Sequence, residues 1–109
     1  MANAYKVLGQ IAPSATTATA IYTVPSATEA VVSSITICER GGSAATFRLA
    51  VRPNGATLSN EHYLVYDATV TANDTIILTL GVTLDAADIL QAYASTGDLS
   101  FQAFGTEIT

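Results

Sequence analysis

The chain has 109 residues, enough for one domain with one modest core. Charged residues make up only 12 %, against about 25 % in typical globular domains, and the net charge is −5. The negative charge argues against nucleic acid or an anionic membrane surface as a partner, because phosphate groups are bound by basic patches. A surface so poor in charge favours an oligomer or a larger particle over a monomer coated with Thr, Ser and Ala.

The chain carries no sequence signal for a membrane span or for a disulfide. No apolar run approaches the roughly 20 residues that span a bilayer, and the N-terminus lacks the pattern of a signal peptide. The single cysteine, Cys38, cannot form an internal disulfide, so packing must supply the stability. We expect Cys38 to be a small buried apolar residue, since only Arg40, two positions on, favours a reactive thiolate.

Apolar and polar residues alternate with period two along most of the chain, which predicts β-strands. The expected strands cover residues 5–8, 19–24, 30–39, 45–52, 61–67, 75–80, 88–95 and 99–104. Residues 12–20 are expected to form a loop or a loose edge, and residues 82–88 a connection with room for one helical turn. We expect residues 105–109 to pair as a sheet edge or to extend to a neighbour.

The faces and turns of these strands can also be predicted. Val31, Ile35 and Ile37 are expected on one face of their strand, and Ile76, Leu78 and Leu80 are expected to point inward. Turns are expected at residues 40–43, 53–55, 72–74 and 96–98, and the last should close a hairpin. About eight short strands without a convincing amphipathic helix predict a single all-β domain over residues 1–109, an antiparallel β-sandwich or jelly roll.

Two of the four basic residues, Arg48 and Arg52, lie on the strand 45–52. The apolar side chains of that strand alternate with them, so both arginines are expected on the outer face. We expect them to pair with Asp or Glu across the sheet or on a neighbouring subunit, which makes a polyanionic ligand unnecessary. With Arg40 and His62, they are the candidates for an assembly interface.

We expect no catalytic site, metal or cofactor. Ser59 and Asp67 lie near His62 in sequence, but strand spacings do not converge on it, so His62 is interpreted as a strand residue on a polar or interface face. One Cys and one His give no zinc signal. Three carboxylates could contribute to a calcium site, but they match no recognised loop spacing and are better interpreted as turn formers: Asp85, Asp88 and Asp98.

Four tyrosines leave one alternative open, a sugar-stacking platform formed by Tyr22, Tyr63, Tyr66 and Tyr93. Tyr63 and Tyr66 have opposite parity along their strand, so they are expected on opposite faces. This expectation weakens the case for a shared platform.

Several segments carry a resemblance to a known family. The stretches YKVLGQ, YTVPS, RPNGATL and YAST, followed by LSFQAFGTE near the end, resemble small virion structural proteins of tailed bacteriophages, especially those infecting cyanobacteria and other aquatic bacteria. The similarity covers nearly the whole chain, and members are described as virion structural or tail fibre proteins. The resemblance carries no site residues with it.

The resemblance implies a non-enzymatic subunit on the surface of the virion, made in the cytoplasm of the bacterial host. We expect a homo-oligomer, in particular a trimer, that decorates the capsid as a cement protein and contacts the major capsid protein. Two alternatives stay open: a tail-associated subunit of a fibre, collar or baseplate, which would contact tail proteins, and a glycan-binding module for host attachment.

Overall fold

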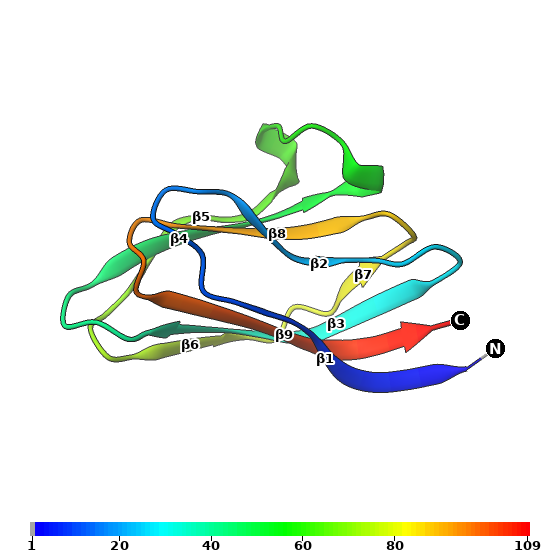
Figure 1. Cartoon of the computed structure of the whole chain (residues 1–109), viewed down its shortest axis with the longest axis horizontal. Coiled ribbons are helices and arrows are strands. Elements are labelled where there is room, and N and C mark those ends of the chain that lie inside the picture. Colours follow the sequence, from blue (N-terminus) through cyan, green and yellow to red (C-terminus); the bar gives the residue numbers. More distant parts are fainter. Residues whose placement is uncertain (1) are drawn as a thin grey trace.

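The computed structural model describes residues 2–109 as two antiparallel β-sheets packed face to face (Figure 1). One sheet contains β1 (Asn3–Ile11), β3 (Glu29–Glu39), β6 (Thr75–Leu78), β7 (Val82–Leu84) and β9 (Leu99–Ile108). The other contains β2 (Thr19–Thr23), β4 (Ala45–Arg52), β5 (Tyr63–Val70) and β8 (Ile89–Ala94). The predicted all-β sandwich is confirmed.

The strand order is that of a jelly roll. The first sheet runs β1-β9-β3-β6, and β7 pairs with β3 beside β6, so β6 and β7 together occupy one strand position. The second sheet runs β2-β8-β4-β5. The chain crosses from one sheet to the other at most of its connections, which is how a jelly roll places sequence neighbours in different layers.

The core lies between the two sheets. Phe47 and Leu49 of β4 face Ile37 of β3 and Phe101 of β9, and all four are at most 1 % exposed. The rings of Phe47 and Phe101 meet edge to face, with their centroids 6.1 Å apart. The core explains the alternation in the sequence, because every second side chain of a strand points inward and must be apolar.

A bulge changes the predicted face of β3. The pairing of β3 with β9 shifts between Val32 and Ser34, so one extra residue reverses the parity of the strand. Val32, Ile35 and Ile37 are therefore buried together, and Val31 is on the other side. The prediction that grouped Val31 with Ile35 and Ile37 is wrong for this reason.

Three expectations about residues 75–104 are wrong. The strand β6 ends at Leu78, so Leu80 is exposed rather than inward, and Val82–Leu84 form β7 where a helical turn had been expected. Gly81 separates the two strands with a φ of +64°. The turn at residues 96–98 joins β8 to β9, which lie in different sheets, so it closes no hairpin. Alternation of apolar and polar residues predicts where strands lie in the sequence, but not to which sheet each strand belongs.

Both ends of the chain belong to the five-stranded sheet. β1 continues past Gly9, where the sequence predicted its end, and β9 extends to Ile108 between β1 and β3. The expectation of an edge at residues 105–109 is wrong, because residues 105–108 pair with β1 on one side and with β3 on the other. Next to them, Ala2 and Thr109 exchange two backbone hydrogen bonds of 2.8 and 2.9 Å. The termini therefore lie side by side (Figure 1).

Between β4 and β5 a loop lies over part of the four-stranded sheet (Figure 1). It contains two short 3₁₀ turns, η1 (Pro53–Gly55) and η2 (Asn60–His62). The predicted turn at residues 53–55 is confirmed, since Asn54 and Gly55 both have positive φ. The strand predicted from residue 61 begins only at Tyr63. Within residues 2–109, no helix is long and apolar enough to cross a membrane.

Candidate functional site

Arg48 lies at the centre of a cluster on the outer face of the four-stranded sheet. Its neighbours on β4, Phe47 and Leu49, are buried in the core, so Arg48 points outward as predicted. Tyr93 is directly across from it on β8, because Arg48 and Tyr93 are paired in register. On the other side of Arg48 lies β5, whose backbone is irregular at this point.

Register shifts in β5 bring its tyrosines together. Phe47 is paired with Ala68, but Leu49 is paired with Val65, so Tyr66 and Asp67 bulge opposite Arg48. Asp67 has a φ of +54°, an unusual backbone conformation that Asp tolerates better than most residues. The register shifts a second time between Val65 and Tyr63, because Leu49 is paired with Val65 and Ala50 with Tyr63.

The rings of Tyr63 and Tyr66 consequently meet edge to face on the outer surface, with centroids 4.9 Å apart. The prediction that Tyr63 and Tyr66 point to opposite faces is wrong, because the bulges break the period-two rule on which it rested.

Arg48 is held from three directions. Its Nε donates a hydrogen bond to Oδ1 of Asp67 at 2.7 Å, and its Nη2 lies 3.4 Å from Oδ2. The guanidinium carbon is 4.2 Å from the centroid of the Tyr66 ring and 4.5 Å from that of Tyr93. The hydrogen bond to Asp67 raises the pKa of Arg48 above its usual value. The predicted pairing of an arginine with a carboxylate across the sheet is confirmed for Arg48.

Arg52 and His62 brace the loop beside this cluster. Nη1 of Arg52 donates to the carbonyl of Ala56 at 3.2 Å, so its contact is a backbone oxygen rather than the expected carboxylate. Nδ1 of His62 accepts from the backbone N–H of Ser59 at 3.1 Å, and the Ser59 side chain accepts from the backbone of His62. The interpretation of His62 as a strand residue is wrong, because it closes η2.

Arg40 lies at the opposite end of the sandwich. Its Nη2 donates to the carbonyl of Gly97 at 2.8 Å, which connects the β3–β4 turn to the β8–β9 turn. Of the four candidates chosen from sequence, Arg48 is in the cluster, Arg52 and His62 support its border, and Arg40 is remote from it.

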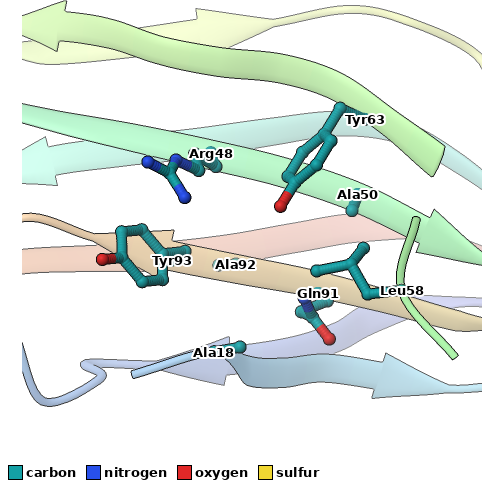
Figure 2. Close-up of a pocket in the computed structure, with 8 residues that line it drawn as sticks. All are labelled: Ala18, Arg48, Ala50, Leu58, Tyr63, Gln91, Ala92 and Tyr93. Atoms are coloured by element: carbon teal, nitrogen blue, oxygen red, sulfur yellow. The ribbon is translucent and has the colours of Figure 1, made fainter. Parts of the chain in front are cut away.

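A small pit opens beside Arg48 (Figure 2). Its floor is formed by Ala50 of β4 and by β8 at Ala92, whose own methyl group is on the core side because Ala92 is paired with Leu49. The side chains around it come from β4, β5, β8, the β4–β5 loop and the residue before β2: Arg48, Tyr63, Gln91, Tyr93, Leu58 and Ala18. A water-sized sphere can occupy about 20 Å³ of this space, which is room for one small group and not for a buried ligand.

Of the three acidic residues considered for calcium, Asp98 lies apart from Asp85 and Asp88. Oδ1 of Asp88 accepts from the backbone of Asn54, and Oδ2 accepts from the backbone of Asp85, both at 2.8 Å. Asp98 lies beyond the opposite end of β8. The interpretation of Asp85 and Asp88 as turn formers is confirmed. Among residues 2–109, no three His, Cys, Asp or Glu side chains are grouped closely enough to hold a metal ion.

The outer face of the five-stranded sheet forms a second surface, which we call the uncharged face. The register places its residues in four rows across the strands: Tyr5, Thr106, Val31 and Thr83; Val7, Phe104 and Ser34; Gln10, Gln102, Thr36 and Ile77; Ser100, Cys38 and Thr75. Cys38 is partly exposed here, so the expectation of a buried cysteine is wrong.

The composition of this face differs from that of the rest of the molecule. None of the residues in its four rows is charged, and Glu29 lies just beyond them. Tyr5 is 81 % exposed and Ile77 67 %, although both are large and apolar in character. The two ion pairs of Lys and Arg with carboxylates, Lys6–Glu107 and Arg48–Asp67, lie elsewhere. The low charge of the sequence is therefore most evident on this face, whose four rows hold no charged residue.

Comparison with known proteins adds no relative. The chain matches no protein-family model, and a search of curated protein sequences found no match.

Proposed function

We propose that the protein is a non-enzymatic structural subunit of a bacteriophage particle that self-associates through the uncharged face. The single observation that carries the self-association is this face, on which Tyr5, Val7 and Ile77 are exposed and no side chain is charged. The phage setting rests on the sequence resemblance. The fold is compatible with it, since viral capsid domains use jelly rolls, as do lectins and cupins.

A second copy of the chain is the occupant that suits this face. The centres of protein interfaces are depleted in charged residues, because desolvating a charge is costly. The ten-residue length of β9 and the four strand positions of the sheet outline roughly 650 Å² at the usual rise and spacing of strands. That area approaches the roughly 800 Å² per partner of a standard stable interface, before the relief of the side chains is counted.

The expected trimer places a condition on the contact. Two identical patches pair only about a two-fold axis, whereas a cyclic trimer joins two different patches of each subunit. In a trimer the uncharged face would therefore meet another surface of its neighbour. The sequence-based prediction for Arg48 would place that surface on the outer face of the four-stranded sheet.

Sedimentation velocity tests the self-association. We expect the wild-type protein to sediment as a dimer or trimer and Ile77→Glu to sediment as a monomer, because the variant places a charge in the contact. Ala44→Glu adds the same charge in an exposed turn and should sediment as the wild type does. A wild-type monomer at high concentration would overturn the proposal.

The position on the particle is a separate question. We propose capsid decoration, in which the subunit contacts the major capsid protein and adds interface area that stabilises the shell. The alternative is a subunit of a tail fibre, collar or baseplate. Mass spectrometry of separated heads and tails distinguishes them, and recovery with tails alone would exclude capsid decoration.

A further inference from the structure

We propose that the pit beside Arg48 binds a neutral carbohydrate and accepts the methyl group of an acetamido sugar. The inference rests on other observations than the self-association does, because the pit lies on the other sheet. A trimer contact at Arg48 would cover the pit, so the test includes the Ile77→Glu variant. It is carried by the convergence of Tyr63, Tyr66 and Tyr93 on one surface, which the parity of the sequence did not predict.

The tyrosine rings are held in place before any ligand arrives. Arg48 lies against both Tyr66 and Tyr93, and Asp67 fixes the guanidinium through two contacts. Tyr63 is in turn fixed by its edge-to-face contact with Tyr66. Rings that are already ordered lose little conformational entropy on binding, which favours weak ligands such as sugars.

The chemistry of the pit matches an acetamido group. Ala18, Ala50 and Leu58 form an apolar lining, and the space suits one methyl-sized group. Gln91 also lines the pit and carries an amide, which can both donate to and accept from the amide of the ligand. Tyr63 and Tyr93 offer aromatic surface to the C–H groups of a sugar ring and hydroxyls to its polar edge (Figure 2).

The charges favour a neutral sugar over an acidic one. The carboxylate of Asp67 already neutralises Arg48, and the whole chain carries a net charge of −5. An anionic ligand would therefore meet little uncompensated positive charge at the pit. Arg48 has five N–H groups, of which Asp67 engages two, so the others can donate to sugar hydroxyls.

A titration followed by NMR tests the proposal on the intact wild-type protein. The probes are N,N′-diacetylchitobiose and cellobiose, which differ in their acetamido groups. At millimolar diacetylchitobiose we expect shifts of the methyl signals of Ala18, Ala50 and Leu58, with those of Val7 and Ile77 unchanged. Cellobiose should need at least about threefold higher concentration for the same shifts. Equal responses to both sugars would overturn the acetamido assignment.

Variants provide the second arm of the test. Tyr63→Ala should weaken binding about tenfold, because it removes one wall of the pit. Tyr63→Phe should bind nearly as the wild type does, and Leu80→Ala, an exposed apolar residue on the other sheet, should be unaffected. If Tyr63→Ala fails to fold, the map of shifts in the wild type decides alone.

Two further results would overturn the inference. One is the absence of shifts around the pit in both the wild type and Ile77→Glu, which should bind sugar even if assembly covers the pit. The other is a proline-rich peptide that produces the same shifts at much lower concentration, which would assign the pit to a peptide. Binding of diacetylchitobiose by Ile77→Glu would support the site whatever the oligomeric state.

Discussion

Arg48 on β4 binds Asp67 on β5 through a 2.7 Å hydrogen bond at the bulge that Tyr66 and Asp67 form. Within the bulge Asp67 has a φ of +54°, and both of its carboxylate oxygens lie near the guanidinium. Because Phe47 is paired with Ala68, Asp67 would be opposite Arg48 even in a regular ladder. The bulge instead turns Tyr66, which would otherwise be opposite Leu49, to the outer face. The cluster on this face is therefore a product of backbone irregularity as much as of side-chain chemistry.

The conformation of Asp67 gives a first prediction. Asp67→Val should lower the free energy of unfolding by about 1–2 kcal/mol, because a branched side chain is strained at positive φ. Asp67→Asn should change stability little, since Asn tolerates this conformation and an exposed ion pair contributes little. Urea unfolding at neutral pH measures both. Equal losses for the two variants would show that the charge, and not the backbone, determines the effect.

A second prediction concerns Arg48 itself. Arg48→Ala should have little effect on subunit folding, because the side chain lies at the surface and its contacts are with Asp67 and two tyrosine rings. The sequence-based interpretation expects the variant to weaken assembly more than folding. Sedimentation and urea unfolding should be measured on the same preparation. A parallel loss of assembly and of subunit stability would refute this prediction.

Two glycines provide a third prediction with a matched control. A Cβ added at Gly9 would overlap the backbone carbonyl of Ile21, whereas one at Gly42 would meet no atom within 4 Å. Gly9→Ala should therefore destabilise the protein by about 1–3 kcal/mol, the usual cost of overpacking. Gly42→Ala should be close to neutral. Thermal unfolding of the two variants checks this, and similar melting temperatures would mean that β1 can move away from β2.

The two sheets are also joined by a polar bridge at one end. The hydroxyl of Tyr22 on β2 donates to Oε2 of Glu107 on β9 at 2.6 Å, and Nζ of Lys6 lies 2.6 Å from Oε1. The side chain of Glu107 is 12 % exposed. The hydrogen bonds from Lys6 and Tyr22 lower the pKa of Glu107, while burial, followed by the hydrogen bond to Glu107, raises the pKa of Tyr22.

These shifts predict how stability depends on pH. The lowered pKa of Glu107 contributes stability above the ordinary value of 4.5, and this contribution is lost as the pH falls through the folded-state pKa. The raised pKa of Tyr22 contributes stability that is fully present below the ordinary value of 10.0 and declines as the pH rises above it. The melting temperature should therefore fall at both extremes.

Variants of Glu107 and Tyr22 test whether these two residues cause the acid and alkaline falls in melting temperature. Glu107→Gln should reduce the acid-induced fall, because its amide does not titrate. Tyr22→Phe should reduce the alkaline fall and lower the stability at neutral pH by about 1 kcal/mol through the lost hydrogen bond. Circular dichroism melts from about pH 3 to pH 11 cover both ranges. An unchanged profile in Tyr22→Phe would assign the alkaline limb to other groups.

Most strands could be predicted from the sequence, because alternation is a local property. Phe47, Leu49 and Val51 alternate with Arg48 and mark the inner and outer sides of β4 without any tertiary information. The turn residues Pro53, Asn54 and Gly55 also carry their own conformational preferences. The outward position of Arg48 and its pairing with a carboxylate followed from this local information.

The candidate site could be predicted only in part. Arg48 was identified, but its contact with Tyr66 depends on a bulge that no period-two pattern reveals. Its contact with Tyr93 depends on β8 being the strand beside β4, which the sequence did not show. Asp67 followed by Ala68 gives no sequence signal of a left-handed residue, unlike Asn54 and Gly55. A polar residue between strand-forming residues is the one clue, and it is too common to locate a bulge.

The sequence alone determined that this chain forms β-strands, places the apolar residues of β4 inside and has few charges for its size. Only the tertiary structure decided that β8 and β9 belong to different sheets, that β9 lies between β1 and β3, and that the missing charges leave one face uncharged. Alternation and turn preference act over a few neighbouring residues, whereas sheet membership, register shifts and surface patches depend on which strands meet. The pairing of strands is determined by packing of the whole core, which no short segment of the chain encodes.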